Sequence, residues 1–391
     1  MAEKILVINP GSASKKYALY EDGRELFYAH FETEAGKILL TTKTPAGEEK
    51  KNLEAGDFQL AIGHTLNLMT EKGIIAGKDD LSAIGVRVVA PGDFFLEHRP
   101  LDEKYLSKLR EISLEAPLHI LPTLKEIEAA TSLFSDLPFF GISDSAFHKQ
   151  MPAYARNYAI AGEDAARFDI YRFGYHGLSA QSVLRKLEEN LGVMPARIII
   201  CHLGGGASVT AVKSGTSIEN SMGFSPLEGL PMSTRVGNID AGAIIHFAQK
   251  TGLTLVQLED YFNHKSGLLG LSGKTGDVRE LIKLEKDGDE KAALALNAFA
   301  YAVKKYIGSY FAVLGGLDIL AFSGAIGDRS PIMRGRVCDN LGALGILLDE
   351  EKNNSTVEKM GFIHNSWSSV KIVVIPTDEM TEIAVEVDRF F

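Results

Sequence analysis

At 391 residues the chain is too long for one hydrophobic core and long enough for two domains of ordinary size. Its 45% apolar and 24% charged residues are typical of a soluble globular protein. A formal net charge of −10, with no lysine or arginine tract, argues against nucleic acid or an anionic membrane as the main partner.

The cysteines and the apolar stretches indicate a cytoplasmic protein. Only two cysteines occur, Cys201 and Cys338, and their spacing fits neither a disulfide framework nor a zinc site. The apolar run in MAEKILVINPGS is too short for a signal peptide. Residues 307–326 are apolar, but a Gly-Gly pair and Asp318 divide them into a helix end and a buried strand.

The first part of the chain predicts three short strands, separated by a Gly/Ser-rich turn and by an Asp-Gly turn. Helices and two further strands follow. The expected strands are 4–9, 17–20, 25–31, 82–89 and 139–143, and the expected helices are 57–72, 103–112 and 123–133.

The second part repeats this order. An apolar run at 197–200 leads into three consecutive glycines, and two alternating segments at 207–213 and 216–221 flank a Ser-Gly turn. Helices are expected at 241–250, 255–262 and 290–314, strands at 319–323 and 371–375, and a closing helix from Thr377 onward.

The repeat predicts an α/β fold of two related domains that face each other across a cleft. Its period is far too long for a solenoid. We place the domains at residues 1–147 and 148–377, with the last helix, 378–391, packing back on the first domain.

Glycine-rich turns supply the candidate phosphate sites, because glycine lets backbone N–H groups approach an oxyanion without a side chain in the way. The turn Gly11–Lys16 adds hydroxyls and a cation but lacks the spacing of a P-loop. The turn Gly204–Gly206 is bracketed by His202 and Ser208. For both turns, a plain hairpin is the alternative interpretation. The segment Gly324–Gly327 follows a strand and could present N–H groups to a nucleotide.

Two arginines are candidate anion ligands. Arg87 lies inside the apolar strand IGVRVV, and a buried guanidinium needs an anionic partner. Arg235 follows a long loop in MSTR. If both met at one anion, they would clamp a carboxylate or a phosphoryl group. An internal salt bridge is the alternative for Arg87.

Three further residues are candidates because of their position. His176 is flanked by two glycines in FGYHG, which favours a functional loop over a core position. Asp144 follows the strand FFGIS, at a carboxyl end where α/β domains usually place their sites. Its alternative role is a helix N-cap. Glu379 begins the final helix, where an acid commonly complements the helix dipole, but it could also serve a metal.

Together these stretches resemble the acetate kinase (acetokinase) family in order and spacing. The family's NxGSSSxK is matched by Asn9–Lys16, its FDTAFH by Ser143–His148 and its YGFHG by Phe173–Gly177. Its signature HLGxGAS…SMGxTPLEGLxMxTRxGxxD is matched by His202–Ser208, Ser221–Gly229 and Met232–Asp240. SGLLGLSGKTGDVR, FSGAIGD, LGILLDEEKN and PTDE also have counterparts in the family. The resemblance spans essentially the whole chain.

The resemblance implies two duplicated ribonuclease H-like domains of the actin/sugar-kinase/Hsp70 type. It implies reversible phosphoryl transfer between ATP and acetate, with ATP or ADP as co-substrate, Mg²⁺ (or Mn²⁺) as metal, and a homodimer. The implied catalytic residues are Arg87, Asp144, His176 and Arg235, with Asn9 and Glu379 at the metal.

The resemblance also implies the binding residues. The phosphate and nucleotide set is Asn9, Ser12, Ser14, Lys16, His202, Gly204, Gly205, Gly206, Asp277, Arg279, Gly324, Ala325, Ile326 and Gly327. The acyl-binding set is Arg87, Val89, Leu118, Tyr175 and Pro226.

The chain departs from the family pattern near the acyl and donor sites. Tyr175 stands where YGFHG has phenylalanine, and Gly205 stands where asparagine is common. Asp328 and Arg329 replace the EN of GGIGEN, which adds a positive charge beside the expected nucleoside site. Propionate as acceptor and pyrophosphate or phosphate as phosphoryl partner therefore stay as alternatives, and a non-catalytic nucleotide-binding protein is a third.

Overall fold

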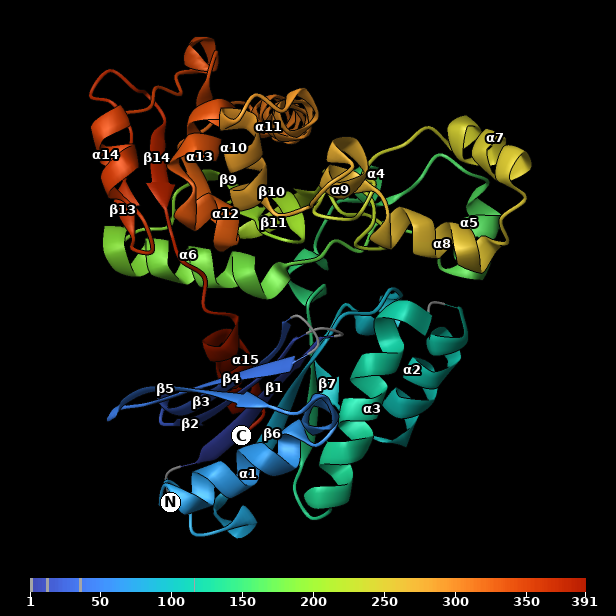
Figure 1. The fold of residues 1–391 in the computed structure, drawn as a ribbon, viewed down its shortest axis with the longest axis vertical. Helices are drawn as coiled ribbons and strands as arrows, with labels where there is room; N and C mark the ends of the chain where they lie inside the picture. Colours follow the sequence, from blue (N-terminus) through green and yellow to red (C-terminus); the bar gives the residue numbers. More distant parts are fainter. Residues whose placement is uncertain (1–2, 12–13, 35–36, 116) are drawn as a thin grey trace. The chain divides into compact units, whose positions relative to one another are not determined.

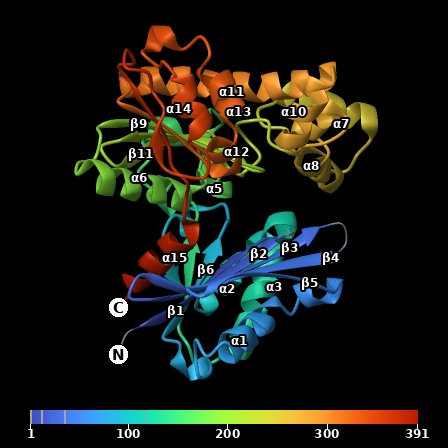
Figure 2. The same cartoon turned by 60° about the vertical axis from the view of Figure 1, so that its left-hand side comes forward.

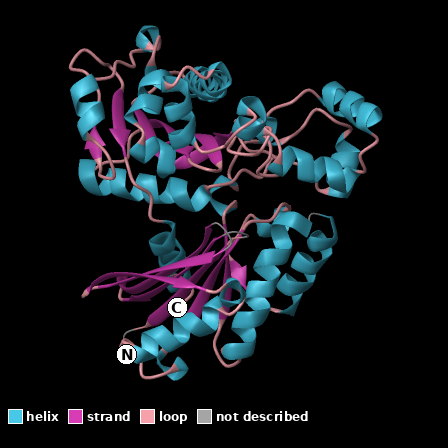
Figure 3. Ribbon diagram, in the orientation of Figure 1, coloured by secondary structure: helices cyan, strands magenta, loops and turns pink. Residues whose placement is uncertain are grey.

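The computed structural model describes residues 3–11, 14–34, 37–115 and 117–391. The chain divides into two compact units, Met1–Ala146 with Asp378–Phe391, and Phe147–Thr377. Each unit has its own β-sheet with helices packed on it (Figure 3).

The first unit is built on a sheet with strand order β5-β4-β3-β2-β1-β6-β8-β7. Figure 1 labels its strands β1 to β7. Strands β1 to β5 form an antiparallel meander, whereas β1, β6 and β8 run parallel. The strands are β1 (Lys4–Pro10), β2 (Ser14–Glu21), β3 (Arg24–Glu34), β4 (Lys37–Thr44), β5 (Gly47–Leu53), β6 (Ala83–Val88), β7 (Arg99–Pro100) and β8 (Phe139–Ser143). The helices are η1 (Ala55–Phe58), α1 (Ala61–Glu71), η2 (Lys78–Asp80), η3 (Asp93–Phe95), α2 (Glu103–Glu115), α3 (Pro117–Leu133), η4 (Ala146–His148, at the junction of the units) and α15 (Glu379–Asp388).

The second unit is built on a sheet with strand order β11-β10-β9-β12-β14-β13. Figure 2 shows β9 and β11 of this sheet between α11 and α6. The strands are β9 (Arg197–Leu203), β10 (Ala207–Lys213), β11 (Thr216–Asn220), β12 (Ile319–Ser323), β13 (Gly361–Phe362) and β14 (Lys371–Val374). The helices are α4 (Ala153–Arg156), α5 (Gly162–Phe168), α6 (Gly177–Leu191), α7 (Ala241–Thr251), α8 (Leu255–His264), α9 (Gly267–Ser272), α10 (Val278–Lys286), α11 (Glu290–Leu314), α12 (Gly324–Arg329), α13 (Pro331–Cys338), η5 (Gly342–Leu344) and α14 (Glu350–Ser355).

The two sheets share one topology. The order β3-β2-β1-β6-β8 corresponds to β11-β10-β9-β12-β14, and in both the first two pairings are antiparallel and the next two parallel. This confirms the duplicated α/β fold that the sequence repeat predicts. None of the helices that the structure describes is long and apolar enough to cross a membrane.

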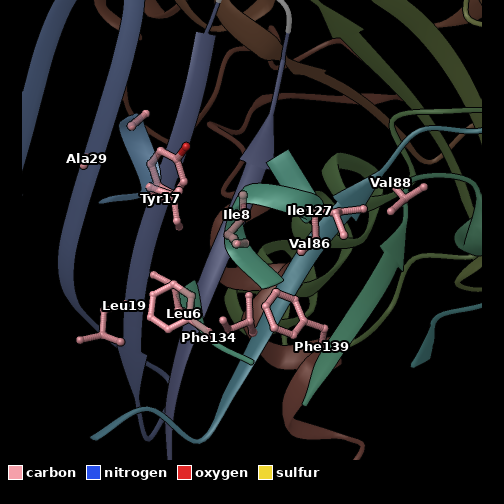
Figure 4. Packing of buried hydrophobic residues seen from close by; sticks show 14 of the residues in the cluster. Leu6, Ile8, Tyr17, Leu19, Ala29, Val86, Val88, Ile127, Phe134 and Phe139 are labelled. Carbon is pink, nitrogen blue, oxygen red and sulfur yellow. The ribbon is translucent and has the colours of Figure 1, made fainter. Parts of the chain in front are cut away.

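Alternation along the strands of the first unit directs side chains to two faces of the sheet. Leu6 and Ile8 of β1 join the buried cluster that also contains Ile127 of α3 (Figure 4). On the other face, α15 packs close to β6. A β-carbon built at Gly85 would lie 2.5 Å from a methyl carbon of Val387, so α15 approaches the sheet only because position 85 has no side chain.

The hairpin β4–β5 is absent from the elements expected from sequence. β5 has the sequence GEEKKNL, and every residue but its last is exposed. Such a strand has no apolar face and therefore no alternating pattern. Charged side chains are common on edge strands, where they discourage pairing with other chains.

A buried ion pair connects β2 to α3. The Nζ atom of Lys15 lies 2.5 Å from a carboxylate oxygen of Glu126, whose side chain is 2% exposed. The hydroxyl of Tyr17 donates to the other oxygen of Glu126 (2.5 Å), and Lys15 Nζ also donates to the carbonyl of Phe58 (2.8 Å). The first unit therefore fixes the strand that follows the Gly11–Lys16 turn by a satisfied polar network.

Glu126→Ala leaves the Lys15 ammonium buried without its carboxylate. We expect the free energy of unfolding to fall by about 3–5 kcal/mol, as for other broken buried pairs. Urea denaturation measures this change. Glu128→Ala, an exposed position on the same helix, is the control, with an expected effect within about 0.5 kcal/mol. Equal stability of the two variants would contradict a structural role for the pair.

Candidate active site

The first unit gathers four of the predicted residues around Arg87. Asn9, Arg87 and Asp144 lie at or just after the carboxyl ends of the neighbouring parallel strands β1, β6 and β8. Glu379 lies in the first turn of α15. Adjacent parallel strands bring their carboxyl ends to one edge of the sheet, which explains why residues far apart in the sequence meet here.

Arg87 is ion-paired inside this cluster. Its Nη2 and Nε atoms lie 3.0 and 3.2 Å from the two carboxylate oxygens of Asp144, and its Nη1 lies 3.2 Å from Glu379. Asn9 accepts from Arg87 (3.3 Å) and donates to Glu379 (3.4 Å). Burial acts to lower the pKa of Arg87, but the charges of Asp144 and Glu379 outweigh it and raise the pKa above its ordinary value. The internal salt bridge, left open as an alternative, is thus present.

The Arg87 cluster has a donor set that suits Mg²⁺. Two carboxylates face one guanidinium, which leaves a net negative charge, and Asn9 adds an amide. No group of three His, Cys, Asp or Glu side chains that could enclose a metal occurs among the described residues. Mg²⁺ rarely uses such an all-protein cage and is usually held by one or two carboxylates together with water and substrate phosphates.

The Gly11–Lys16 turn is described only in part. Ser12 lies outside the described residues. Ser14 bonds to a ring nitrogen of His30 (3.2 Å), and Lys16 pairs in register with His30 on β3. Burial, together with the charges of Lys16 and Lys43, lowers the pKa of His30 to about 4, so this ring is neutral at pH 7.

The second unit gathers His176, His202 and the glycine turn. His202 is the penultimate residue of β9, and Ser208 pairs with it in register on β10. A ring nitrogen of His176 bonds to the Ser208 hydroxyl (2.9 Å), and the two imidazoles stack with centroids 4.2 Å apart. Ser179 on α6 bonds to His202 (2.6 Å). The sequence interpretation missed Ser179, whose signal is its place one helical turn after His176.

His176 is held in a conformation that ordinary residues avoid. It has φ of 59°, in the left-handed region, directly before α6. A single residue there costs on the order of 1–2 kcal/mol and persists only where its surroundings impose it. The constraint comes from the preceding peptide, since the carbonyl of Tyr175 accepts from His148 Nε2 (3.0 Å) and Asn220 Nδ2 (3.2 Å).

His176 and Arg235 converge on Gly206. A β-carbon built at Gly206 would lie 3.4 Å from Nε2 of His176 and 3.6 Å from Nη1 of Arg235. Beside it, a β-carbon at Gly204 would lie 3.7 Å from the backbone nitrogen of Ala325 in α12. The glycine turn therefore leaves open space in front of two nitrogen-bearing side chains and next to the first residues of α12.

Arg235 differs from Arg87 in having no counter-charge. Its Nη1 atom donates to the carbonyl of Pro226 (3.4 Å) and lies 3.8 Å from the sulfur of Met232, and none of the carboxylates in the described parts of the chain forms an ion pair with it. Burial alone lowers its pKa. A partly desolvated guanidinium without a counter-ion is costly, which makes Arg235 a candidate ligand for an anion.

The predicted nucleoside residues fall into two places. Gly324, Ala325, Ile326 and Gly327 form the short helix α12, where the sequence predicts a glycine turn. This difference arises because Gly324 has φ of 73° and starts the helix directly at the end of β12. Asp277 and Arg279 pair with each other at the start of α10 (2.5 Å), and Arg279 is largely exposed.

Buried Arg334, which the sequence interpretation missed, fixes the end of α12. Its side chain is fully buried and donates to the carbonyls of Gly327 (2.8 Å) and Asp328 (3.0 Å) and to those of Asn353 and Thr356. Bonds to carbonyl groups leave no pattern in a sequence, so nothing marks this residue in advance.

The acyl-binding residues are described separately in each unit. Val89 follows β6 in the first unit and is half-buried, and the side chain of Leu118 lies outside the described residues. In the second unit Tyr175 and Pro226 are buried. The Tyr175 hydroxyl, expected to alter the acyl pocket, donates to the carbonyl of Phe224 (2.7 Å).

Gly206→Ala places a methyl group in the space before His176 and Arg235 without a forced clash. We expect the affinity for inorganic phosphate, measured by isothermal titration calorimetry, to fall about tenfold or more because the methyl group occupies the position of an oxyanion. Gly308→Ala, inside α11, is the control, because its β-carbon would meet no atom within 4 Å. Equal phosphate affinity in the two variants would rule out Gly206 as the anion position.

Comparison with known proteins identifies the family of this chain. The model of the acetokinase family matches residues 4–385. The acetate kinase of Heliobacterium modesticaldum is 40% identical over 395 residues and covers 98% of each chain. The acetate kinase of Bacteroides thetaiotaomicron is 40% identical over 391 residues, which cover 97% of this chain and 98% of that protein.

Solved structures lead to the same family. The crystal structure of Porphyromonas gingivalis acetate kinase superposes with a TM-score of 0.87 at 32% identity and covers 99% of both chains. A propionate kinase from Francisella tularensis gives a TM-score of 0.89 at 33% identity and covers 98% of both. The match over nearly the full length, with the motif residues of each unit brought together, shows that this chain belongs to the acetokinase family.

Proposed function

We propose that this protein is a small-carboxylate kinase that transfers a phosphoryl group reversibly between ATP and acetate. The observation that carries the proposal is Arg235, a partly desolvated guanidinium without a carboxylate partner that faces Gly206 together with His176. The names of the curated relatives support acetate as the acceptor.

The chemistry needs little acid–base work. A carboxylate oxygen is already a nucleophile, so the protein has to align the reactants and neutralise the charge spread over the moving phosphoryl group. Arg235 and His176 are suited to that charge, because they are positioned before the reaction and partly shielded from water. His202 and the Gly204–Gly206 turn are assigned to the phosphates, and α12 with Asp277 and Arg279 to the nucleoside.

The first unit is assigned to the acceptor and the metal. Arg87 would hold the carboxylate, and Val89 and Leu118 of the same unit would contact its methyl group. In the second unit, the acyl assignment falls on Tyr175 and Pro226. Asn9, Asp144 and Glu379 would hold Mg²⁺ or its water ligands. Bound there, the ion would neutralise phosphate charge. Ser12, Ser14 and Lys16 are assigned to the phosphates.

Pyrophosphate as the phosphoryl partner is the weaker candidate. The extra charge of Arg329 suggested it, but Arg329 pairs with Glu358 (2.9 Å), and both side chains are more than half exposed. Its charge is therefore balanced locally and faces solvent. We retain ATP as the donor. Two free, buried cysteines accord with a cytoplasmic protein.

Arg235→Ala tests the proposal. We expect the rate of acyl phosphate formation, trapped as the hydroxamate, to fall about 10³-fold, the usual effect of losing an arginine that stabilises phosphoryl transfer. Arg329→Ala is the matched control, with a rate within twofold of wild type. A loss of less than tenfold for Arg235→Ala would refute the assigned role.

We also propose a homodimer formed through α7 and α8. The helix α7 has the sequence AGAIIHFAQKT, yet none of its residues is fully buried. Its Phe247 contacts Tyr261 and Phe262 of α8. Large apolar side chains remain exposed on the pair, namely Ile245 (59%), Leu255 (85%) and Val256 (64%). Such a grouping on a globular protein usually marks a protein–protein contact.

Replacing both Leu255 and Val256 by glutamate should yield monomers, whereas the wild type sediments at twice the chain mass. The two positions open α8, where acids suit the helix dipole, so the helix itself should persist. Sedimentation equilibrium gives the mass. Val193→Glu, at another exposed apolar residue, should leave the dimer intact. A wild-type monomer, or a double variant that stays dimeric, would disprove this interface.

A further inference from the structure

The peptide groups of Phe224 are held by two tyrosine hydroxyls. The N–H of Phe224 donates to the hydroxyl oxygen of Tyr158 (2.9 Å), and its carbonyl accepts from the hydroxyl of Tyr175 (2.7 Å). The neighbouring carbonyl of Gly223 accepts from the N–H of Phe173 (3.1 Å). The segment that leads to Pro226 is therefore fixed on both sides.

The Tyr158 side chain, which accepts from the N–H of Phe224, is itself held by further interactions. The Tyr158 hydroxyl donates to Glu228, which forms an ion pair with Arg172 (2.6 Å). The guanidinium of Arg172 in turn lies over the Tyr158 ring, 4.8 Å from its centroid. Gly223 is required for this arrangement, since a β-carbon there would lie within 2.1 Å of both the Tyr158 and Glu228 oxygens.

The Tyr175 side chain, which donates to the carbonyl of Phe224, is also held in place. Tyr175 is 1% exposed, and its own carbonyl is held by His148 and Asn220, as described above. Its side chain thus spans from the turn that orients His176 to the carbonyl of Phe224. Phenylalanine, which the family pattern has at this position, would leave that carbonyl without the hydroxyl bond.

The two hydrogen bonds to Phe224 affect the candidate active site through Pro226 and Arg235. Two residues after Phe224, the carbonyl of Pro226 accepts from Nη1 of Arg235 at 3.4 Å, a long bond that depends on where Pro226 lies. Any shift of the Phe224–Pro226 segment therefore moves the Pro226 ring, which we assign to the wall of the acyl pocket, and also changes the position of Arg235.

We propose that the Tyr175 hydroxyl is a positioning group that fixes Pro226 and thereby restricts the carbon chain of the carboxylate substrate. This inference rests on the proposed function, because it takes Pro226 as an acyl-contacting residue. A fixed wall selects the shortest carboxylates, whereas a wall that moves can accommodate additional methylene groups. In a hydrophobic pocket, one additional methylene group changes the preference between two substrates only modestly. A pocket that adapts to the longer acid would lose even this preference, so a fixed Pro226 is needed to keep it.

Tyr175→Phe tests the inference because it keeps the ring and removes one hydrogen bond. We expect kcat/KM for propionate and butyrate, relative to acetate, to rise about 3- to 10-fold, the range of one neutral hydrogen bond. KM for ATP should stay within twofold of wild type. Tyr158→Phe, which releases the N–H of Phe224, should change the ratio in the same direction.

Tyr105→Phe is the matched control. The Tyr105 hydroxyl is buried and forms no hydrogen bond with any residue that the structure describes, so its loss should leave the substrate ratio unchanged. An unchanged or lowered ratio in both Tyr175→Phe and Tyr158→Phe, while the wild type forms acetyl phosphate, would overturn the positioning role alone. Failure of the wild type to phosphorylate any carboxylate would overturn the proposed function, and this inference with it.

Discussion

Three arginines of this protein are buried or partly buried, and the structure depends on which groups balance their charges. Arg334 is fully buried and donates to four backbone carbonyls, and Arg87 pairs with two carboxylates. Arg235 has only a long bond to a carbonyl and a contact with sulfur. Because removing a guanidinium from water is unfavourable without a partner, the surroundings of Arg235 become complete only when an anion binds. Arg334 therefore fixes backbone carbonyls, Arg87 is held in place by two carboxylates, and Arg235 has no counter-ion among the described residues.

The duplicated topology explains why polar groups collect where they do. In each unit two parallel strands adjoin the first strand of a meander, so three carboxyl ends or turns meet at one edge of a sheet. The first unit places Asn9, Arg87 and Asp144 there. The second places His202, the glycine turn and the start of α12 at the corresponding edge. The same backbone plan therefore supplies a carboxylate-rich edge in the first unit and a nitrogen-rich edge in the second.

The sequence predicts the strand-end residues well because strand order and strand length determine where they lie. Arg87 and Asp144 follow from this logic, whereas Glu379 is marked in the sequence only by its place at the start of the final helix. The sequence does not indicate Arg334 or the Tyr175–Phe224 bond. These side chains orient other groups by hydrogen bonds, many to backbone carbonyls, and such bonds impose no periodicity. The sequence also gives no sign of the exposed strand β5, because its residues are mostly charged and show no alternation of apolar and polar side chains.

The most direct measurement is a matrix of hydroxamate-trapping assays on the purified protein, with acetate, propionate and butyrate as acceptors and with ATP or pyrophosphate as donor in the presence of Mg²⁺. The account predicts acetyl phosphate from ATP with saturation in both substrates, a lower kcat/KM for each longer acid, and no product from pyrophosphate. Product from pyrophosphate alone would contradict the donor assignment. No acyl phosphate from any pair would contradict the central claim that Arg235 and His176 serve phosphoryl transfer to a carboxylate.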